Sequence, residues 1–270
     1  MKKIIALVLA ALMVFALVAC GTSKDDPSTS ASDASSASDT AEKKTLVMAT
    51  NATFPPYEYK DGDNFAGIDV EIAEKIAEKL GMTLEIKDVE FGSIVGGVQT
   101  GKFDIGMAGM TVTDERKESV NFTDSYTTTK QVVIVREDSA IKAISDLKGD
   151  GSMKIGVQQD TTGDILASAT VENGGYGEEN VVRYKAATDT VQALKTGKVD
   201  AVIIDEAPAK SFVKTTEGLK ILDGTWLEEQ YAIAIAKDNT ELLDKVNTAL
   251  KELIADGTVK SIIDKYIPAE

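Results

Sequence analysis

The chain of 270 residues contains no histidine and only one cysteine. Without histidine, Ser-His-Asp triads, histidine metal sites and the commonest general base are all excluded. A single cysteine excludes an intramolecular disulfide. The 29 basic residues, against 44 acidic ones, form no cluster interleaved with aromatic residues, so nucleic acid is not an expected partner. No EF-hand-type spacing of acidic residues occurs, and we expect neither a metal nor a cofactor.

The chain also lacks a long apolar run. Lys2 and Lys3 precede an uncharged apolar segment over residues 4–19, which is shorter than the ~20-residue apolar core of a typical membrane-spanning helix with its flanks. This pattern predicts a signal peptide over residues 1–19. The segment ends in LVAC, which resembles the lipobox of bacterial lipoproteins, so we expect a lipid on Cys20. An ordinary secretory signal with an unrelated cysteine is the alternative.

Residues 20–42 are predicted to be a disordered tether. The stretch TSKDDPSTSASDASSASDTA contains no aromatic residue and no Val, Ile, Leu or Met. It therefore buries too little apolar surface to offset the entropy lost on ordering. A lipid at Cys20 followed by a solvated tether is typical of a protein held at the outer face of the cell membrane with its binding surface free.

After the tether, patterns of strands and helices alternate. TLVMAT (45–50) indicates a buried strand, and GIDVEIAEKIAEKLG (67–81) indicates a helix with an apolar face that ends at Gly81. Further strands are expected at 83–89, 103–108, 131–137, 153–157, 181–184 and 199–205, and further helices at 94–100, after Thr161, at 188–195 and, as a pair, from Thr240 onward. This alternation predicts an α/β fold with largely parallel sheets.

Two segments repeat one plan. VQTGKFDIGMAG (98–109) and LKTGKVDAVIID (194–205) both place Thr-Gly-Lys after a helix and before a buried strand, which predicts two similar lobes. The Thr-Gly-Lys lacks the further glycine of a phosphate-binding loop and indicates a helix stop. In open α/β sheets, ligands bind beyond the carboxyl ends of the strands. Those ends lie at Ala108–Thr111 and at Asp205.

The residues beyond these strand ends suit a zwitterion. Arg116 offers a planar fork for a carboxylate, and Asp205 offers an acceptor for an ammonium group. The helix start at Thr161 and Thr162 presents free N–H groups that favour an anion. A ligand with both charges on one carbon is an α-amino acid.

Five motifs in order resemble the solute-binding proteins of polar amino-acid ABC importers, which include glutamine-, histidine- and lysine/arginine/ornithine-binding proteins. The motifs are ATNATFPPYEY, GIDVEIAEKIAEKLG, GMTVTDERK followed by VNFTDSY, IGVQQDTTG and GKVDAVIID, and the resemblance runs from about Leu46 to Ile267.

The resemblance implies a periplasmic-binding-protein fold, with two α/β lobes joined by two crossover strands. Lobe 1 is expected to hold residues 43–131 and 232–270, lobe 2 residues 132–231, with hinges near 126–130 and 227–231. The implied function is capture of a polar L-amino acid by a monomer, closure of the lobes, and delivery to a membrane permease driven by ATPase subunits.

The resemblance also implies residue roles. Arg116 matches the carboxylate-binding arginine and Asp205 the ammonium-binding acid. Thr111 matches a residue that binds through hydroxyl and backbone, and Gly109, next to Ala108, one that offers its carbonyl to the ammonium. Thr161 and Thr162 match the loop whose amides meet the carboxylate.

The remaining matches concern the ligand side chain. Phe54 and Phe91 match aromatic walls that supply apolar contact and cation–π attraction. Asn51, Tyr57 and Gln158 match positions that vary among relatives, and they are candidates for reading the side chain. Several relatives carry an acid at the position of Asn51, so a pocket restricted to lysine or arginine is disfavoured unless Glu58 or Glu90 restores the charge. We expect a neutral amide-bearing or a basic amino acid.

Alternatives remain for the residues and for the function. Arg116 is also compatible with a solvated helix charge beside Asp114 and Glu115, and Asp205 with a helix N-cap. The aromatic residues are compatible with core packing, and Thr161 and Thr162 with plain caps. A dehydratase-like enzyme of the same fold would need a carboxyl with a raised pKa, for which Asp205 is the candidate. A sensory domain would need a transmembrane helix and an output domain.

Overall fold

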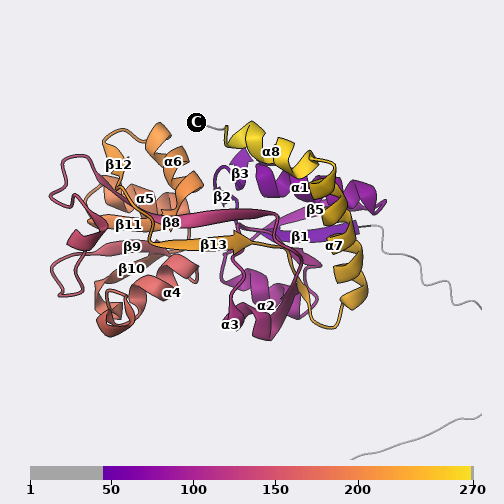
Figure 1. Ribbon diagram of the computed structural model, residues 1–270, viewed down its shortest axis with the longest axis horizontal. Coiled ribbons are helices and arrows are strands. Elements are labelled where there is room, and N and C mark those ends of the chain that lie inside the picture. The colour runs from indigo at the N-terminus through magenta and orange to yellow at the C-terminus, as the bar shows by residue number, and fades with distance from the viewer. Residues whose placement is uncertain (1–44, 269–270) are drawn as a thin grey trace, which may run out of the picture. The chain divides into compact units, whose positions relative to one another are not determined.

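The computed structural model describes residues 45–268, which lie in one compact unit, Glu42–Glu270. The expected signal peptide, Cys20 and the tether lie outside the described residues. From Thr45 onward, strands and helices alternate and build two main sheets, one in each lobe, and a small three-stranded sheet (Figure 1). The prediction of a two-lobe α/β fold is confirmed.

The sheet of lobe 1 has the strand order β5-β1-β6-β14-β7. Strand β1 is parallel to β5 and β6, whereas β14 is antiparallel to β6 and β7. The strands are β1 (Thr45–Thr50), β5 (Thr83–Asp88), β6 (Ile105–Gly106), β7 (Val120–Phe122) and β14 (Ala234–Ala236). A small antiparallel sheet precedes the first helix and contains β2 (Thr53–Phe54), β3 (Glu58–Asp61) and β4 (Asn64–Ala66).

Two groups of helices flank the sheet of lobe 1. Helices α1 (Ile68–Lys79), α7 (Thr240–Ala255) and α8 (Thr258–Tyr266) contact one another. Helix α2 (Ser93–Gln99) contacts β1, β6 and β14, and it also contacts α3 (Asp114–Ser119). The sequence predicted α1, α2 and the closing pair; α3 was not predicted as a separate helix.

The sheet of lobe 2 repeats this scheme with the order β10-β9-β11-β8-β12. Strand β9 is parallel to β10 and β11, whereas β8 is antiparallel to β11 and β12. Its strands are β8 (Thr127–Arg136), β9 (Ile155–Gln158), β10 (Val181–Tyr184), β11 (Ala201–Asp205) and β12 (Leu219–Ile221), and its helices are α4 (Thr162–Ser168), α5 (Ala187–Lys195) and α6 (Glu206–Thr215). Each sheet is therefore mixed, with its parallel strands on one side.

Both faces of the lobe 2 sheet are covered, which explains the unbroken apolar run of β8. Val133 and Val135 join the cluster that contains Ala167 of α4, while Val132 and Ile134 face a cluster that contains residues of α5 and α6. A strand buried on both faces reads as continuous Val and Ile rather than as an alternating pattern.

Two crossover strands join the lobes. Strand β8 continues from lobe 1 into lobe 2, and β13 (Leu227–Tyr231) returns beside it (Figure 1). The two strands pair antiparallel, so that Gln131 lies opposite Leu227 and Thr129 opposite Glu229. Side chains on this pair therefore lie between the two sheets.

The repeated Thr-Gly-Lys segments have the same role in both lobes. Gly101 follows α2 with φ 71°, and Gly197 follows α5 with φ 74°. This left-handed conformation costs glycine little, so each helix stops there and the chain enters β6 or β11. In each sheet the strand that follows lies between a parallel and an antiparallel neighbour.

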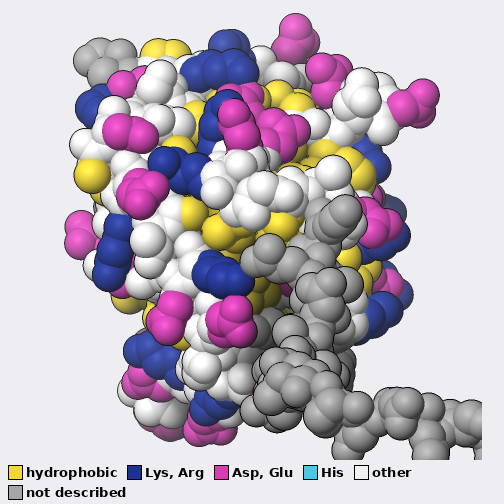
Figure 2. All heavy atoms as spheres, turned by 90° about the vertical axis from the view of Figure 1, so that its right-hand side faces the viewer, with side chains coloured by type: hydrophobic (Ala, Val, Ile, Leu, Met, Phe, Trp, Pro, Cys, Tyr) yellow, Lys and Arg dark blue, Asp and Glu magenta, His cyan; other side chains and the backbone are white. Residues whose placement is uncertain are grey.

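The outer surface of lobe 1 carries both signs of charge. Figure 2 shows Lys and Arg side chains interspersed with Asp and Glu over the part of this face that the described residues form. Among residues 45–268, no helix has both the length and the apolar character needed to cross a membrane.

Candidate functional site

The loops that follow the parallel strands of both sheets meet between the lobes. Strand β1 leads to Asn51, β6 leads to Ala108 and Gly109, β9 ends at Gln158, and β11 ends at Asp205. Because carboxyl ends of parallel strands share one edge of a sheet, these residues converge. They line a cavity together with residues from neighbouring loops, the full lining being Asn51, Phe54, Glu58, Phe91, Ala108, Gly109, Thr111, Arg116, Gln158, Thr161, Thr162 and Asp205.

Every expected binding residue except Tyr57 lies on this cavity. The Tyr57 side chain is buried behind it, and its ring meets the Tyr231 ring edge-on at a centroid distance of 5.0 Å. Tyr57 therefore acts on the cavity by packing. Glu58, the first residue of β3, lines the cavity instead.

Arg116 is buried and held by carbonyl groups rather than by carboxylates. Arg116 is 8 % exposed. Its Nη1 donates to the Thr111 carbonyl at 2.8 Å, and its Nη2 donates to the Asp160 carbonyl at 3.1 Å. Neither Asp114 nor Glu115 forms an ion pair with it among residues 45–268; Asp114 pairs with Lys117. The charges of Glu229, Glu115 and Asp205 act on the guanidinium only from beyond ion-pair distance. A buried guanidinium without an ion pair is costly, so the cavity favours an anion beside Arg116.

The local sequence explains this placement. Thr113 is the N-cap of α3, and its hydroxyl accepts a hydrogen bond from the Arg116 backbone N–H at 3.1 Å. The cap fixes the first turn, so the Arg116 side chain leaves the helix toward lobe 2. The guanidinium lies over the Phe91 ring, 5.2 Å from its centroid, which holds the guanidinium plane in place.

Asp205 lies at the end of β11, directly before α6. The Asp205 side chain makes no capping hydrogen bond to α6; instead, Oδ2 accepts from Gln131 Nε2 at 2.9 Å. Its Oδ1 is buried without a hydrogen-bond partner in the described part of the chain. Burial and the nearby charge of Glu229 raise the pKa of Asp205 to about 7. The carboxyl therefore lacks a cation, and a ligand ammonium group would supply one.

Gly109 fits the cavity wall because it has no side chain. Its φ is 53°, and a Cβ atom there would lie 3.0 Å from Phe54 Cε1 and 3.2 Å from Tyr231 Cε2. Its backbone N–H donates to Asp69 Oδ2 at 2.9 Å, so its loop is fixed against α1. The Gly109 carbonyl is thus placed by a buried acid that sequence reasoning missed.

A second pair of acids consists of Glu58, which lines the cavity, and Asp69 of α1. Glu58 is 1 % exposed, and burial together with the charge of Asp69 raises its pKa well above the usual range. Burial raises the pKa of Asp69 to about 6, although the Gly109 N–H and the Tyr126 hydroxyl oppose this shift. The Tyr126 hydroxyl donates to Asp69 Oδ1 at 2.7 Å. Around the cavity there are thus the three buried carboxyl groups of Asp205, Glu58 and Asp69 and the buried guanidinium of Arg116.

Contacts across the cavity join the two lobes. Gln158 Nε2 of lobe 2 donates to Asn51 Oδ1 of lobe 1 at 2.9 Å, and the bond from Arg116 to the Asp160 carbonyl also crosses. The cavity volume is about 20 Å³, space for about one water molecule. The two lobes thus stand closed over the cavity.

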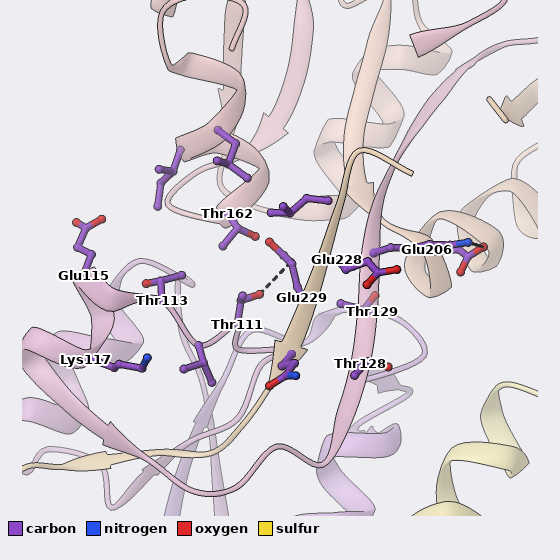
Figure 3. A pocket seen from close by; sticks show the side chains of 16 residues that line it. Thr111, Thr113, Glu115, Lys117, Thr128, Thr129, Thr162, Glu206, Glu228 and Glu229 are labelled. Atoms are coloured by element: carbon purple, nitrogen blue, oxygen red, sulfur yellow. Dashed lines mark hydrogen bonds and ion pairs between the residues drawn. The ribbon is translucent and has the colours of Figure 1, made fainter. Parts of the chain in front are cut away.

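A wider groove opens beside the cavity. It has a volume of about 910 Å³, and Thr111 and Thr162 line both spaces. Figure 3 shows Glu229 of β13 reaching from the groove toward Thr111, with Thr162 close to it. Glu228 lies on the other side of β13 in Figure 3, and Glu206 lies farther away, beyond β8. The groove therefore borders the cavity at Thr111 and Thr162.

Helix α4 begins at the cavity edge. Thr161 is its N-cap, and the Thr161 hydroxyl accepts from the Asp164 N–H at 3.3 Å. Thr161 also donates from Oγ1 to the Gln158 carbonyl at 2.8 Å, which ties the cap to the end of β9. No group of three or more His, Cys, Asp or Glu residues suited to a metal ion occurs within residues 45–268.

The geometry agrees with a comparison against known families. The model of the bacterial extracellular solute-binding proteins, family 3, matches residues 46–269. The chain belongs to this family. The family resemblance that the sequence motifs predicted is thus confirmed.

Characterised proteins similar to this family 3 chain are named for amino acids. The arginine-binding extracellular protein ArtP of Bacillus subtilis (strain 168) is 36% identical over 273 residues, covering 100% of both chains. An ancestral arginine-binding protein bound to arginine is 39% identical, with a TM-score of 0.75 over 83% of this chain and 98% of that one. The ancestral arginine-binding protein bound to glutamine is 38% identical, with a TM-score of 0.76 over 84% and 99%.

Proposed function

We propose that this family 3 protein captures an L-amino acid with a cationic side chain, arginine first, and delivers it to an ABC permease for import. The observation that supports a zwitterionic ligand is that two buried charged residues line one cavity. Within residues 45–268, Arg116 forms no ion pair, and Asp205 Oδ1 has no hydrogen-bond partner. One group lacks an anion and the other lacks a cation, and the α-carboxylate and α-ammonium of an amino acid supply both.

The roles proposed for the lining residues are those that the family resemblance implies. Arg116 and the amides at Thr161 and Thr162 receive the carboxylate, while Asp205, Thr111 and the Gly109 carbonyl receive the ammonium. Phe54 and Phe91 pack beside the ligand, and Asn51 and Gln158 close over it. The division into lobes at 43–131 with 232–270 and at 132–231 is part of this proposal.

Glu58 favours a cationic side chain. It lines the cavity, is 1 % exposed, and its Oε2 has no hydrogen-bond partner among the described residues. A guanidinium or ammonium group within reach would stabilise its ionised form. The names of the arginine-binding relatives support the same class, and the glutamine complex of one relative makes an amide side chain the competitor to test.

The screen for the ligand is a thermal-shift series over the common L-amino acids. A ligand present at 100 times its Kd stabilises the folded protein by about 2.7 kcal/mol, so tight ligands raise the melting temperature clearly. We expect the largest rise with L-arginine and a smaller one with L-lysine or L-glutamine. If only apolar amino acids raise the melting temperature, the cationic assignment is wrong.

The protein is proposed to act as a monomer anchored to the outer face of the cell membrane by a lipid on Cys20, with residues 20–42 as the tether. The partners are the permease and, through it, its ATPase subunits. Cys20→Ser should move the protein from the membrane fraction to the medium or the soluble fraction, whereas Lys24→Ser in the same segment should not. Anchoring that persists in Cys20→Ser would rule out the lipid on this residue.

An enzyme of the same fold is a separate hypothesis, because a carboxyl with a pKa of about 7, such as Asp205, suits proton transfer. In our proposal Asp205 instead pairs with the ligand ammonium and stays ionised. L-Arginine incubated with the protein overnight should be recovered unchanged by mass spectrometry, and stoichiometric or catalytic loss of ammonia would favour the enzyme.

A further inference from the structure

Glu229 lies beside the expected ammonium position, on the crossover strand β13. It is 5 % exposed, although Glu228 and Gln230 on either side of it are exposed. Along a strand, alternate side chains point to opposite faces, so Glu229 and Tyr231 face the interior. A buried glutamate on a connecting strand has an energetic cost, and its surroundings show what offsets it.

The partners of Glu229 are two polar residues of the binding region. Its Oε2 accepts from the Thr111 hydroxyl at 3.0 Å and from Gln131 Nε2 at 3.1 Å (the Thr111 contact is drawn in Figure 3). Neither hydrogen-bond partner is a cation, and the charge of Arg116 acts on Glu229 without forming an ion pair. Its Oε1 is buried and has no hydrogen-bond partner among residues 45–268.

Gln131 joins Glu229 to Asp205. The same Nε2 group donates to Asp205 Oδ2 at 2.9 Å and to Glu229 Oε2 at 3.1 Å, and Gln131 is 1 % exposed. Two buried carboxyl groups thus share one neutral amide, and each keeps one oxygen without a hydrogen bond in the described structure. Such an arrangement is stabilised by a cation that enters with the ligand.

The bond to Glu229 also fixes what Thr111 offers to a ligand. A hydroxyl group has a single hydrogen to donate. Because the Thr111 hydrogen is committed to Glu229, its oxygen presents only acceptor lone pairs to the cavity that Thr111 lines. A ligand group beside the Thr111 oxygen must therefore donate a hydrogen bond, as an ammonium does. A hydroxyl group in its place has only one hydrogen to donate, so it cannot bond to both Thr111 and Asp205.

We propose that Glu229 is a positioning residue for the ligand ammonium: it orients the Thr111 hydroxyl as an acceptor and adds a second negative charge beside Asp205, with Gln131 as the bridge. The site takes members from lobe 1 (Thr111), from lobe 2 (Asp205) and from both crossover strands. The ammonium site is therefore complete only when the two lobes are closed against each other. This proposal rests on the proposed function of the cavity.

The test compares L-arginine with 5-guanidinopentanoate, the same molecule without its α-ammonium group, by titration calorimetry. In the unmodified protein, L-arginine should bind more tightly. Glu229→Gln should weaken L-arginine by about 10- to 100-fold, the loss expected for a charged hydrogen-bonded interaction, and 5-guanidinopentanoate by less than about threefold. The preference for the ammonium-bearing ligand therefore falls.

Glu228→Gln is the matched control, because it makes the same change at the neighbouring, exposed position of β13, and it should leave both affinities unchanged. Thr111→Val provides a second variant that removes the hydroxyl and should lower the same preference. An equal loss for both ligands in Glu229→Gln and Thr111→Val indicates a structural role and overturns the proposal, as does no loss for either ligand. If the unmodified protein binds no ammonium-bearing amino acid, the proposed function itself fails.

Discussion

Replacement of Arg116 by alanine tests the carboxylate half of the site. The guanidinium has five N–H donors, and two of its nitrogens donate to the carbonyls of Thr111 and Asp160. Donors remain for a two-pronged contact with a ligand carboxylate. Two charge-assisted hydrogen bonds are worth about 1.5–3 kcal/mol each, so their loss should raise the Kd for L-arginine by about 100- to 10,000-fold.

The same variant also affects the protein without ligand. The Thr111 and Asp160 carbonyls lose a donor, which costs on the order of 1–3 kcal/mol and lowers the melting temperature by several degrees. Arg116→Lys keeps the charge but not the planar fork, so its affinity for L-arginine should lie between those of the unmodified protein and Arg116→Ala. Lys117→Ala is the control, because Lys117 is exposed and pairs with Asp114.

Titration calorimetry with L-arginine and with agmatine, which lacks the carboxylate, separates the two effects. Arg116→Ala should weaken L-arginine strongly and agmatine little. A Kd for L-arginine in Arg116→Ala within threefold of the unmodified value, in a folded protein, refutes the assignment of Arg116 to the carboxylate.

Two further perturbations test the other parts of the site. Asp205 binds an ammonium only when ionised, and its pKa is about 7. The Kd for L-arginine should therefore rise by about tenfold as the pH falls from 8 to 6. A Kd that stays constant in calorimetry over this range would contradict the assignment of Asp205 to the ammonium. Gly109→Ala puts a Cβ 3.0 Å from Phe54 at φ 53°, and should weaken L-arginine as well as lower the melting temperature. Gly101→Ala is the control, because it has similar backbone strain at φ 71° but no atom within 4 Å of the added Cβ. It should lower the melting temperature without changing the Kd. Equal changes of the Kd in the two variants would argue against a tight wall at Gly109.

The sequence predicted much of the fold because its local signals agree. Apolar periodicity marked the strands and helices, and the two Thr-Gly-Lys stops marked the entries to β6 and β11. The carboxyl ends of the parallel strands then indicated where a ligand site forms; Asp205 ends β11, and Arg116 lies in α3, which follows β6. These features depend on neighbours in the chain, which a single sequence contains.

The sequence did not reveal the roles of Asp69 and Glu229 around the site, because their burial depends on distant pairing. Gln131 meets Glu229 across 98 residues of chain, and Thr111 meets it across 118. The alternation of β13 marks Glu229 and Tyr231 as sharing a face, but not which face is buried. Glu58 and Tyr57 are adjacent in the chain, and which of them faces the cavity depends on how β3 packs against α1.

The most direct test of the account is a crystal structure of the protein grown with L-arginine. We predict one arginine between the lobes, with its carboxylate oxygens within about 3 Å of the Arg116 guanidinium and its α-nitrogen within about 3 Å of Asp205 and the Thr111 hydroxyl. An arginine bound in the outer groove with its carboxylate away from Arg116, or bound in the cavity with its ends reversed, would contradict it.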